Sequence, residues 1–313
     1  MRIFRNIEDI KDIKNAVVTT GSFDGVHIGH KAIINRLRKS AKLIGGESVL
    51  ITFHPHPRRV LYPETEGKDL LLINSQREKI ELLRKAGLDN LIIINFTREF
   101  AQTSSIDFVK NILLGKVNAR KIIVGFNHYF GHNKEGNYHS LYELSKIQGF
   151  DVEEIPEQDI QNETVSSTKI RKALHEGDIQ KANAYLDHQY IIIGELTKGS
   201  EVLKNIGLPT MSIFIDEDIK LIPPEGVYAI SLTSNECYFK GMLNIRHAPS
   251  KFQINQPNIC IDMHLFDIDQ CLVGKTATVF FHKRIRELKN FNDKDDMRKQ
   301  LMYDKQTIDE LIY

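Results

Sequence analysis

A glycine-rich stretch near the N-terminus carries the residues best suited to chemistry. It runs VVTTGSFDGVHIGH over residues 17–30. Glycines let the backbone approach a ligand closely, and a helix N-terminus offers unpaired N–H groups to an anion. His27 and His30 are three positions apart where a helix is expected to begin, so both side chains lie on one side. Imidazoles there, neutral or protonated, can hydrogen-bond phosphate oxygens and stabilise charge that builds in a transition state.

The stretch therefore predicts a phosphate site with His27 and His30 as catalytic candidates. The backbone candidates for phosphate binding are Gly21, Ser22, Phe23, Asp24, Gly25 and Gly29. Asp24 could orient the loop or a Mg²⁺ ion, or it could form a local cap of the turn. The alternative for the whole stretch is a glycine-rich turn with two surface histidines, but the complete strand–GxFDGxHxGH–helix string favours the phosphate site.

Two further motifs lie at places where ligands bind. Ser166, Ser167 and Thr168 begin an expected helix, and Arg171 follows one turn later. Their hydroxyls, the free N–H groups and the guanidinium fork suit phosphate, although a helix cap with a solvated arginine is the alternative. The segment TFHPHP at residues 52–57 contains two His–Pro steps, which predict an extended, rigid loop at the carboxyl end of a strand. There, His54 and His56 could face a ligand or simply decorate the loop.

The first half of the chain alternates apolar strands with helices. The expected strands are Ala16–Thr20, Ser48–Phe53, Leu91–Ile94, Lys121–Val124 and Asp151–Ile155. The expected helices are His30–Leu43, Ser75–Ala86, Ser105–Leu114, Leu141–Gln148, Ser167–Glu176 and Asp178–Leu186. Buried strands separated by helices of this kind predict a parallel sheet covered on both faces.

From Gln189 onward, β-rich runs follow one another closely. They are Tyr190–Leu196, Met211–Ile215, Gly226–Leu232, Glu236–Leu243, Ile259–Phe266 and Thr276–Phe281, and a helix over Asp293–Ile312 ends the chain. Such runs predict an antiparallel barrel or sandwich. We place the domain boundary near Asp187, which gives an α/β domain over 1–186 and a β domain over 187–313.

Composition excludes several classes of protein. The 313 residues include 42 basic and 41 acidic side chains, for a net charge of +1, which argues against a nucleic-acid-binding or membrane-surface protein. Three cysteines without paired spacing fit a reducing compartment and exclude a cysteine zinc site. We find neither a membrane-spanning run nor a signal peptide, so a soluble, cytoplasmic protein with small-molecule partners is expected. The oligomeric state stays open.

The HIGH string at 27–30 resembles the HxGH signature of the nucleotidyltransferases. Its wider context resembles the bacterial bifunctional riboflavin kinase/FAD synthetase family, as do the segments around His56, Asn127 and Thr168. That resemblance implies a Rossmann-like first domain that transfers AMP from ATP to FMN, giving FAD and pyrophosphate. It assigns the phosphate-loop residues and Ser166, Ser167, Thr168 and Arg171 to ATP, and His56 and Asn127 to the flavin. His128 stands where the family usually has an aromatic residue.

The second half resembles the riboflavin kinase module of the same family, a six-stranded barrel that phosphorylates riboflavin. Gly199, Gly207, Thr210 and Ser212 fall on its nucleotide positions, and Thr210 and Ser212 on those that hold Mg²⁺. Asp262 stands at the position of the catalytic base, which is glutamate in the family. Leu203, Lys204, Ser212, Arg246 and Asp262 depart from the pattern at phosphate, metal and base positions. The departures leave two readings: drift with retained kinase activity, or a barrel whose kinase activity is weakened.

Several alternatives remain at this point. The chain could be a monofunctional FAD synthetase with an inactive flavin-binding barrel, or a non-enzymatic flavin-binding or regulatory protein. A class I aminoacyl-tRNA synthetase shares the HIGH string, but no KMSKS-like segment follows. Another small nucleotidyltransferase would explain the first domain and not the barrel.

Overall fold

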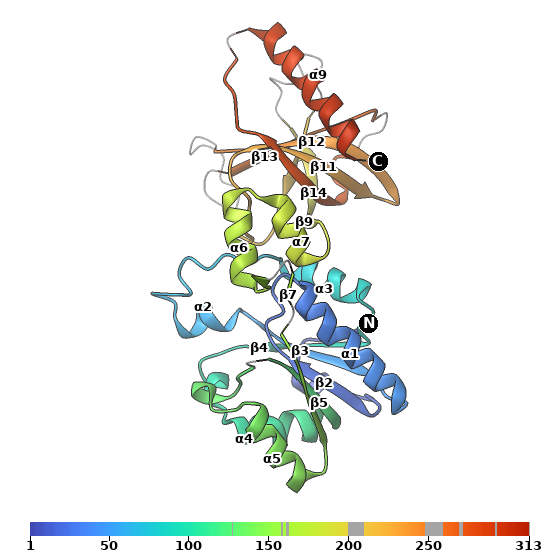
Figure 1. The fold of residues 1–313 in the computed structure, drawn as a ribbon, viewed down its shortest axis with the longest axis vertical. Helices are drawn as coiled ribbons and strands as arrows, with labels where there is room; N and C mark the ends of the chain where they lie inside the picture. The colour runs from blue at the N-terminus through green and yellow to red at the C-terminus, as the bar shows by residue number, and fades with distance from the viewer. Residues whose placement is uncertain are drawn as a thin grey trace. The chain divides into compact units, whose positions relative to one another are not determined.

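The computed structural model describes residues 1–126, 128–157, 159–160, 163–199, 210–247, 259–268, 272–291 and 293–312 (Figure 1). Contacts between residues divide the chain into two compact units. The first contains residues 1–70 and 79–165, and the second contains residues 71–78 and 166–313. The division thus crosses helix α3 (Gln76–Lys85) between Glu78 and Lys79. The boundary that we predict between 186 and 187 stays a prediction.

The first unit is built on a parallel sheet of six strands in the order β1-β4-β3-β2-β5-β6. Its strands are β1 (Arg2–Phe4), β2 (Ala16–Thr20), β3 (Ser48–His54), β4 (Asn90–Asn95), β5 (Ala119–Gly125) and β6 (Asp151–Ile155). The five strands predicted from apolar runs are all present. Strand β1 escapes prediction because its three residues are too few to show a period, and it forms by pairing with β4 at the edge of the sheet.

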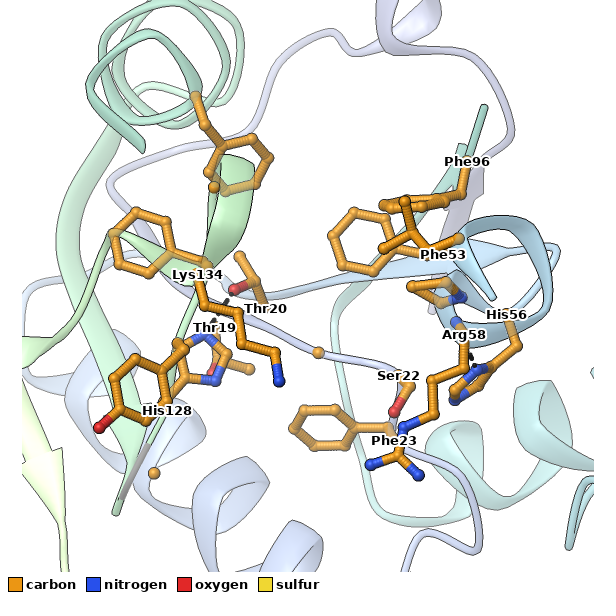
Figure 2. A pocket seen from close by; sticks show the side chains of 18 of the residues that line it. Thr19, Thr20, Ser22, Phe23, Phe53, His56, Arg58, Phe96, His128 and Lys134 are labelled. Carbon is orange, nitrogen blue, oxygen red and sulfur yellow. Dashed lines mark hydrogen bonds between the residues drawn. The ribbon is translucent and has the colours of Figure 1, made fainter. Parts of the chain in front are cut away.

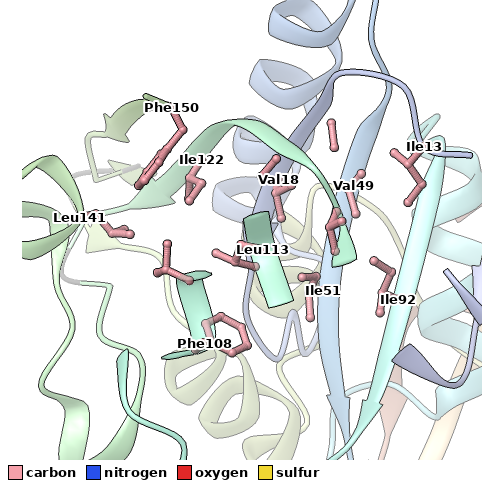
Figure 3. Packing of buried hydrophobic residues seen from close by; sticks show 14 of the residues in the cluster. Ile13, Val18, Val49, Ile51, Ile92, Phe108, Leu113, Ile122, Leu141 and Phe150 are labelled. Carbon is pink, nitrogen blue, oxygen red and sulfur yellow. The ribbon is translucent and has the colours of Figure 1, made fainter. Parts of the chain in front are cut away.

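Helices cover both faces of this sheet, as predicted. Successive side chains of a strand point to opposite faces, so Leu50 of β3 packs with Ile34 of helix α1 (Ile28–Leu43), whereas Ile51 packs on the other face with Phe108 (Figure 3). The remaining elements of the unit are α2 (Pro57–Leu61), α4 (Ser105–Asp107), α5 (Tyr138–Gln148), η1 (Ile7–Asp9), η2 (Phe100–Gln102), η3 (Phe108–Lys116), η4 (His132–Lys134), β7 (Asp159–Ile160) and β8 (Glu163–Thr164).

Two local predictions need correction. The helix expected over Ser105–Leu114 is a short α4 followed by η3, whose turns are π-helical. The loop expected to be extended at the second His–Pro step becomes helix α2 instead, because proline is favourable at the first helical position and the His56 ring accepts a hydrogen bond from the Arg58 N–H.

The second unit contains helices α6 (Ser167–Glu176) and α7 (Ile179–Leu186) and a closed antiparallel barrel in the order β10-β13-β12-β11-β14-β9. The barrel strands are β9 (Tyr190–Lys198), β10 (Met211–Phe214), β11 (Gly226–Ser234), β12 (Cys237–His247), β13 (Ile259–Leu265) and β14 (Thr276–Arg286). The sequence predicted either a barrel or a sandwich, and the structure shows a closed barrel. Strands β12 and β14 run several residues beyond the predicted apolar runs because pairing with β13 and β11 continues there through charged residues.

The C-terminal helix α9 (Lys294–Leu311) is attached to the barrel by an ion pair and an apolar contact. Arg286 on β14 donates hydrogen bonds from Nε and Nη2 to the Asp304 carboxylate, which is fully buried. Ile308 packs in one cluster with Val227 and Ala229 of β11. The predicted terminal helix is therefore an integral part of the second unit.

A second buried ion pair attaches residues 71–78 to the barrel unit. Lys220 and Glu78 are both fully buried, and the Lys220 ammonium lies 2.7 Å from Glu78 Oε2. The ammonium also donates to the carbonyls of Ile73 and Ile191, and it lies 4.2 Å from the centre of the Tyr190 ring. All of these partners stabilise a charge that would otherwise be costly to bury.

Candidate active sites

The phosphate loop joins the end of β2 to the start of α1 and is anchored by two buried apolar side chains. Phe23 and Val26 are 3% and 0% exposed and belong to the cluster around Leu50. Both have a left-handed backbone, with φ of 47° and 43°. Such a conformation costs about 1–3 kcal/mol for a non-glycine residue and is found mostly at functional sites. Burial of these two side chains forces the backbone between them into a tight turn.

The two histidines stack on each other at the N-terminus of α1. His27 is the N-cap residue, and His30 follows in the first turn. Their ring centroids are 3.6 Å apart with planes at 21°, and the Phe23 ring stacks on His30 at 4.3 Å. A Cβ at Gly29 would lie 3.3 Å from the His27 ring, so a larger residue there would crowd the stack. The predicted juxtaposition of His27 and His30 is present.

Burial keeps both imidazoles neutral near pH 7. Desolvation lowers the pKa of His27 to about 4, against a smaller opposing effect of the Asp24 charge. Desolvation also lowers the pKa of His30 well below its usual value, aided by the charges of His27 and Lys79. Within the part of the chain that the structure describes, neither Nδ1 atom has a hydrogen-bond partner. Neutral imidazoles can donate one N–H and accept at the other nitrogen, which suits contact with phosphate oxygens.

A cavity of about 930 Å³ opens in front of the loop (Figure 2). This volume is near the upper end of the ~300–1,000 Å³ range of ligand pockets. Gly21, Ser22, Phe23, His27, Gly29 and His30 line it, as do the aromatic residues Phe53, Tyr62, Phe96, Phe100, Phe108, Phe126, Tyr129 and Phe130. A planar ring system can stack on aromatic walls of this kind. The cavity therefore combines an aromatic wall with the glycine-rich loop and its two histidines.

The residues predicted at the flavin site differ in where the structure places them. His56 lines the cavity, although its Nδ1 is occupied by the Arg58 N–H. Asn127 lies outside the described residues. His128 lines the cavity, its Nε2 is 3.1 Å from the Thr20 hydroxyl, and its ring stacks with Phe130 at 6.1 Å. Burial lowers the pKa of His128 to about 4, so its imidazole ring is neutral near pH 7.

The serine–threonine–arginine motif lies in the second unit. Ser166 is the N-cap of α6 and accepts a hydrogen bond from the Lys169 N–H. Ser167 and Thr168 follow in the first turn, and Arg171 Nε donates to the Leu71 carbonyl at 2.8 Å. Asp24 and Gly25 lie in the loop of the first unit, with Asp24 buried and Gly25 at a φ of 93°. The predicted role of the α6 motif at that loop stays a prediction.

The barrel holds a second, smaller cavity of about 130 Å³. Its polar lining residues are Thr210, Asn244, Asp262, His264, Arg286 and Lys289. Gly199 approaches Thr210 closely: its N–H donates to the Thr210 carbonyl, and a Cβ at Gly199 would lie 2.5 Å from that residue. Gly207, Leu203 and Lys204 lie outside the described residues. Two of the predicted nucleotide positions thus come together at the barrel wall.

Asp262 is held from two sides. It is 5% exposed, and its Oδ1 accepts a hydrogen bond from the Ser212 hydroxyl at 2.5 Å. Its Oδ2 accepts from Arg246 Nη2 at 3.1 Å and from Nε at 3.3 Å. Strand register explains the contacts, since Ser212 on β10 is paired with Asp262 on β13, and Arg246 lies on β12 next to β13. Asp262 therefore contacts two other positions that depart from the family pattern, Ser212 and Arg246.

Sequence reasoning misses several residues of these sites. Thr20, Arg58 and Lys134 line the large cavity, and Asn244 lines the small one with its Oδ1 unpaired among the described residues. A signal was available for Arg58, which directly follows the His–Pro steps. The others come from separate elements, and no local pattern marks them.

No helix among the described residues is long and apolar enough to cross a membrane. In the same residues, no three His, Cys, Asp or Glu side chains gather as a metal-binding group.

Comparison with known proteins gives two family matches. The model of the FAD synthetase family matches residues 9–169, and that of the riboflavin kinase family matches residues 186–312. A bifunctional riboflavin kinase/FMN adenylyltransferase of Buchnera aphidicola subsp. Schizaphis graminum (strain Sg) is 33% identical, covering 97% of this chain and 96% of its own. Its namesake in Bacillus subtilis (strain 168) is 32% identical, covering 93% and 90%.

A solved structure resembles the whole chain as well. It is named as a macrolide-efflux protein from Streptococcus pneumoniae, and it superposes with a TM-score of 0.86 at 25% identity, covering 98% of this chain and 97% of that one. The likeness therefore extends over the α/β unit and the barrel unit together. Both modules are matched in order, and relatives of the same two-module kind align over nearly the full length, so the chain belongs to the bifunctional riboflavin kinase/FMN adenylyltransferase family.

Proposed function

We propose that the first unit joins ATP and FMN to give FAD and pyrophosphate. The observation that carries this proposal is the stacked, neutral His27–His30 pair on a glycine-rich loop at the floor of an aromatic-lined cavity. A phosphate oxygen of FMN attacks the α-phosphorus of ATP, a new P–O bond forms, and the bond to pyrophosphate breaks. The attacking phosphate is already an anion, so positioning and charge stabilisation are the main requirements.

Different residues are proposed to position the substrates and to stabilise the charge. The N–H groups of Gly21 to Gly25 and the N-terminus of α1 bind the triphosphate, and the helix dipole favours its negative charge. The N–H groups of His27 and His30 donate to oxygens on which charge increases as pyrophosphate leaves. We also propose that Ser166, Ser167, Thr168 and Arg171 bind the nucleotide and that His56 and Asn127 bind the flavin. The isoalloxazine ring stacks among the aromatic residues of the cavity wall.

For the barrel we propose riboflavin phosphorylation with Asp262 as the base that takes the proton of the riboflavin hydroxyl. Gly199, Gly207, Thr210 and Ser212 are the proposed nucleotide residues. We propose that this activity is weak, because both oxygens of Asp262 are already engaged by Ser212 and Arg246. The carboxylate of aspartate also ends about one C–C bond short of that of glutamate, and a misplacement of ~1 Å can cost about a hundredfold in rate.

Mg²⁺ fits the residues at this end of the barrel. Mg²⁺ prefers oxygen ligands and is usually held by one or two protein groups together with substrate phosphates. Thr210 and Ser212 supply hydroxyl oxygens beside the Asp262 carboxylate, which is a suitable donor set for an ion that arrives with ATP. When bound, the ion neutralises phosphate charge. Since both reactions consume ATP, we place the protein in the cytoplasm, with ATP, FMN and riboflavin as its partners.

The test is chromatography of the flavin products after incubation with MgATP and either riboflavin or FMN. FAD from FMN at a high rate, with slow FMN and FAD formation from riboflavin, is the expected result. FAD from FMN alone would identify a monofunctional FAD synthetase with an inactive barrel. No FAD from either substrate would refute the adenylyltransferase assignment and favour a flavin-binding protein.

A further inference from the structure

Lys79 is a buried lysine for which the proposed reaction has no role. It lies on α3 in the first unit and is 3% exposed. Lysine is almost never fully buried unless it is paired, since its ammonium loses hydration. Its Nζ donates a hydrogen bond of 2.8 Å to the carbonyl of Ser22, inside the phosphate loop. The charge therefore lies directly behind the loop that is proposed to bind phosphate.

The Ser22 carbonyl has a second donor on the same side. The hydroxyl of Thr52, a fully buried residue of β3, lies 3.2 Å from it. Ser22 and Phe23 line the large cavity, whereas Thr52 and Lys79 are not among its described lining residues (Figure 2). The two donors thus pull the carbonyl away from the cavity.

The planar peptide bond links the direction of the Ser22 carbonyl to the direction of the Phe23 N–H. In a trans peptide the C=O and the following N–H point in opposite directions. The bond between Ser22 and Phe23 is trans, since the cis bond of the described chain is that between His54 and Pro55. With the Ser22 carbonyl turned back toward Lys79, the Phe23 N–H is turned toward the cavity. Lys79 also lies near enough to His30 for its charge to lower the pKa of that imidazole.

We propose that Lys79 is a positioning residue for adenylyl transfer. It fixes the peptide after Ser22 so that the Phe23 N–H faces the phosphates of ATP, and it places a basic group directly behind the loop. This inference rests on the proposed adenylyltransferase function. According to this inference, the positive charge that favours an anionic ligand belongs to Lys79 behind the loop and not to the imidazoles of His27 and His30.

The experiment compares Lys79→Met, Lys79→Arg and Lys85→Met. Lys85 is an exposed lysine on the same helix and serves as the matched control. For FAD formation from FMN we expect Lys79→Met to lower kcat by about 10- to 100-fold, with KM for FMN within about twofold. This is less than the ~100- to 1,000-fold that deletion of a preorganised donor costs, because the Phe23 N–H is misoriented and not removed. Lys79→Arg keeps a donor and a charge and should recover part of kcat, while Lys85→Met should match the wild type.

A second variant keeps the test valid if Lys79→Met does not fold. Thr52→Val removes the other donor to the same carbonyl and leaves Lys79 in place, and we expect a kcat loss of about threefold, as for a neutral hydrogen bond. Full kcat in folded Lys79→Met, or an equal loss of kcat in folded Lys79→Met and Lys79→Arg, would overturn the proposal.

Binding of inorganic pyrophosphate separates this proposal from the proposed function. Measured by calorimetry, its affinity should fall about tenfold in Lys79→Met, the equivalent of one charge-assisted hydrogen bond, and stay unchanged in Lys85→Met. If the wild type binds pyrophosphate but forms no FAD, the proposed function fails while Lys79 is still tested. Equal pyrophosphate affinity in the wild type and Lys79→Met would refute the role of Lys79.

Discussion

Replacing Arg246 by glycine should accelerate the kinase reaction of the barrel. Arg246 donates two hydrogen bonds to Asp262 Oδ2, at 3.1 and 3.3 Å, and Ser212 occupies Oδ1. A base must offer a free oxygen to the hydroxyl that it deprotonates. In the wild-type protein the riboflavin hydroxyl has to compete with Arg246 for Oδ2 and with Ser212 for Oδ1. Glycine removes the contact and leaves Ser212 in place.

The size of the effect follows from the exposure of the ion pair. Hydrogen bonds to charged groups contribute about 1.5–3 kcal/mol. The side chain of Arg246 is 38% exposed and that of Asp262 is 6% exposed, so solvent screens the pair on one side. We therefore take ~1–2 kcal/mol for the contact, below the buried value and above that of a surface pair. At about 1.4 kcal/mol for each factor of ten, the release corresponds to an increase of about 5- to 30-fold in kcat/KM.

The assay is the initial rate of FMN plus FAD formation from riboflavin and MgATP. Arg246→Lys keeps a positive charge and should gain less than Arg246→Gly. Lys240→Gly, on the same strand β12, controls for the effect of a strand glycine. Adding Asp262→Asn should abolish the gain. A folded Arg246→Gly protein with an unchanged or lower kcat/KM would refute the reasoning, because the arginine would then not restrain the base.

Two further predictions concern stability. Lys220→Met should destabilise the barrel unit by about 3–5 kcal/mol in urea unfolding, because it leaves the Glu78 carboxylate buried without its cation, and adding Glu78→Gln should restore much of the loss. A loss under ~1 kcal/mol would contradict this account. Stability should also fall between about pH 6.5 and 4, since the pKa of His27 and His128 is lowered to about 4 from 6.5 and the unfolded chain takes up protons first. Each histidine contributes ~3 kcal/mol to that fall. The free energy of unfolding should differ less between pH 7.5 and pH 4.5 in His128→Phe than in the wild type. An equal difference in the two proteins would refute the contribution of His128.

The elements that depend on local pattern were open to prediction from the sequence. The buried strands of the parallel sheet, such as Ser48–His54, are continuous apolar runs, and the histidine pair depends only on its spacing at the start of a helix. The closely spaced β runs predicted an antiparallel barrel or sandwich. Spacing within one segment predicts these features because it shows which side chains of the segment are buried, although the strands that pair lie far apart in the chain.

Charge states needed the tertiary structure. The spacing of His27 and His30 allowed neutral or protonated imidazoles, and burial among loop residues decides for the neutral form. The extended loop predicted at the His–Pro steps ends at His56, because the His56 ring caps a helix that the sequence did not predict. Both outcomes depend on what surrounds a side chain, and a local pattern does not contain that information.

The long-range pairs were also decided by the fold alone. Lys79 and Ser22 are brought together by the packing of α3 against the sheet, Lys220 and Glu78 by the docking of residues 71–78 on the barrel, and Arg246 and Asp262 by strand register. The sequence by itself determined the family, the two kinds of fold and the placement of two histidines at the start of a helix. Only the tertiary structure decided which charges support that loop and which restrain the barrel's aspartate, because the partners lie on separate elements and meet only when the sheet and the barrel have formed.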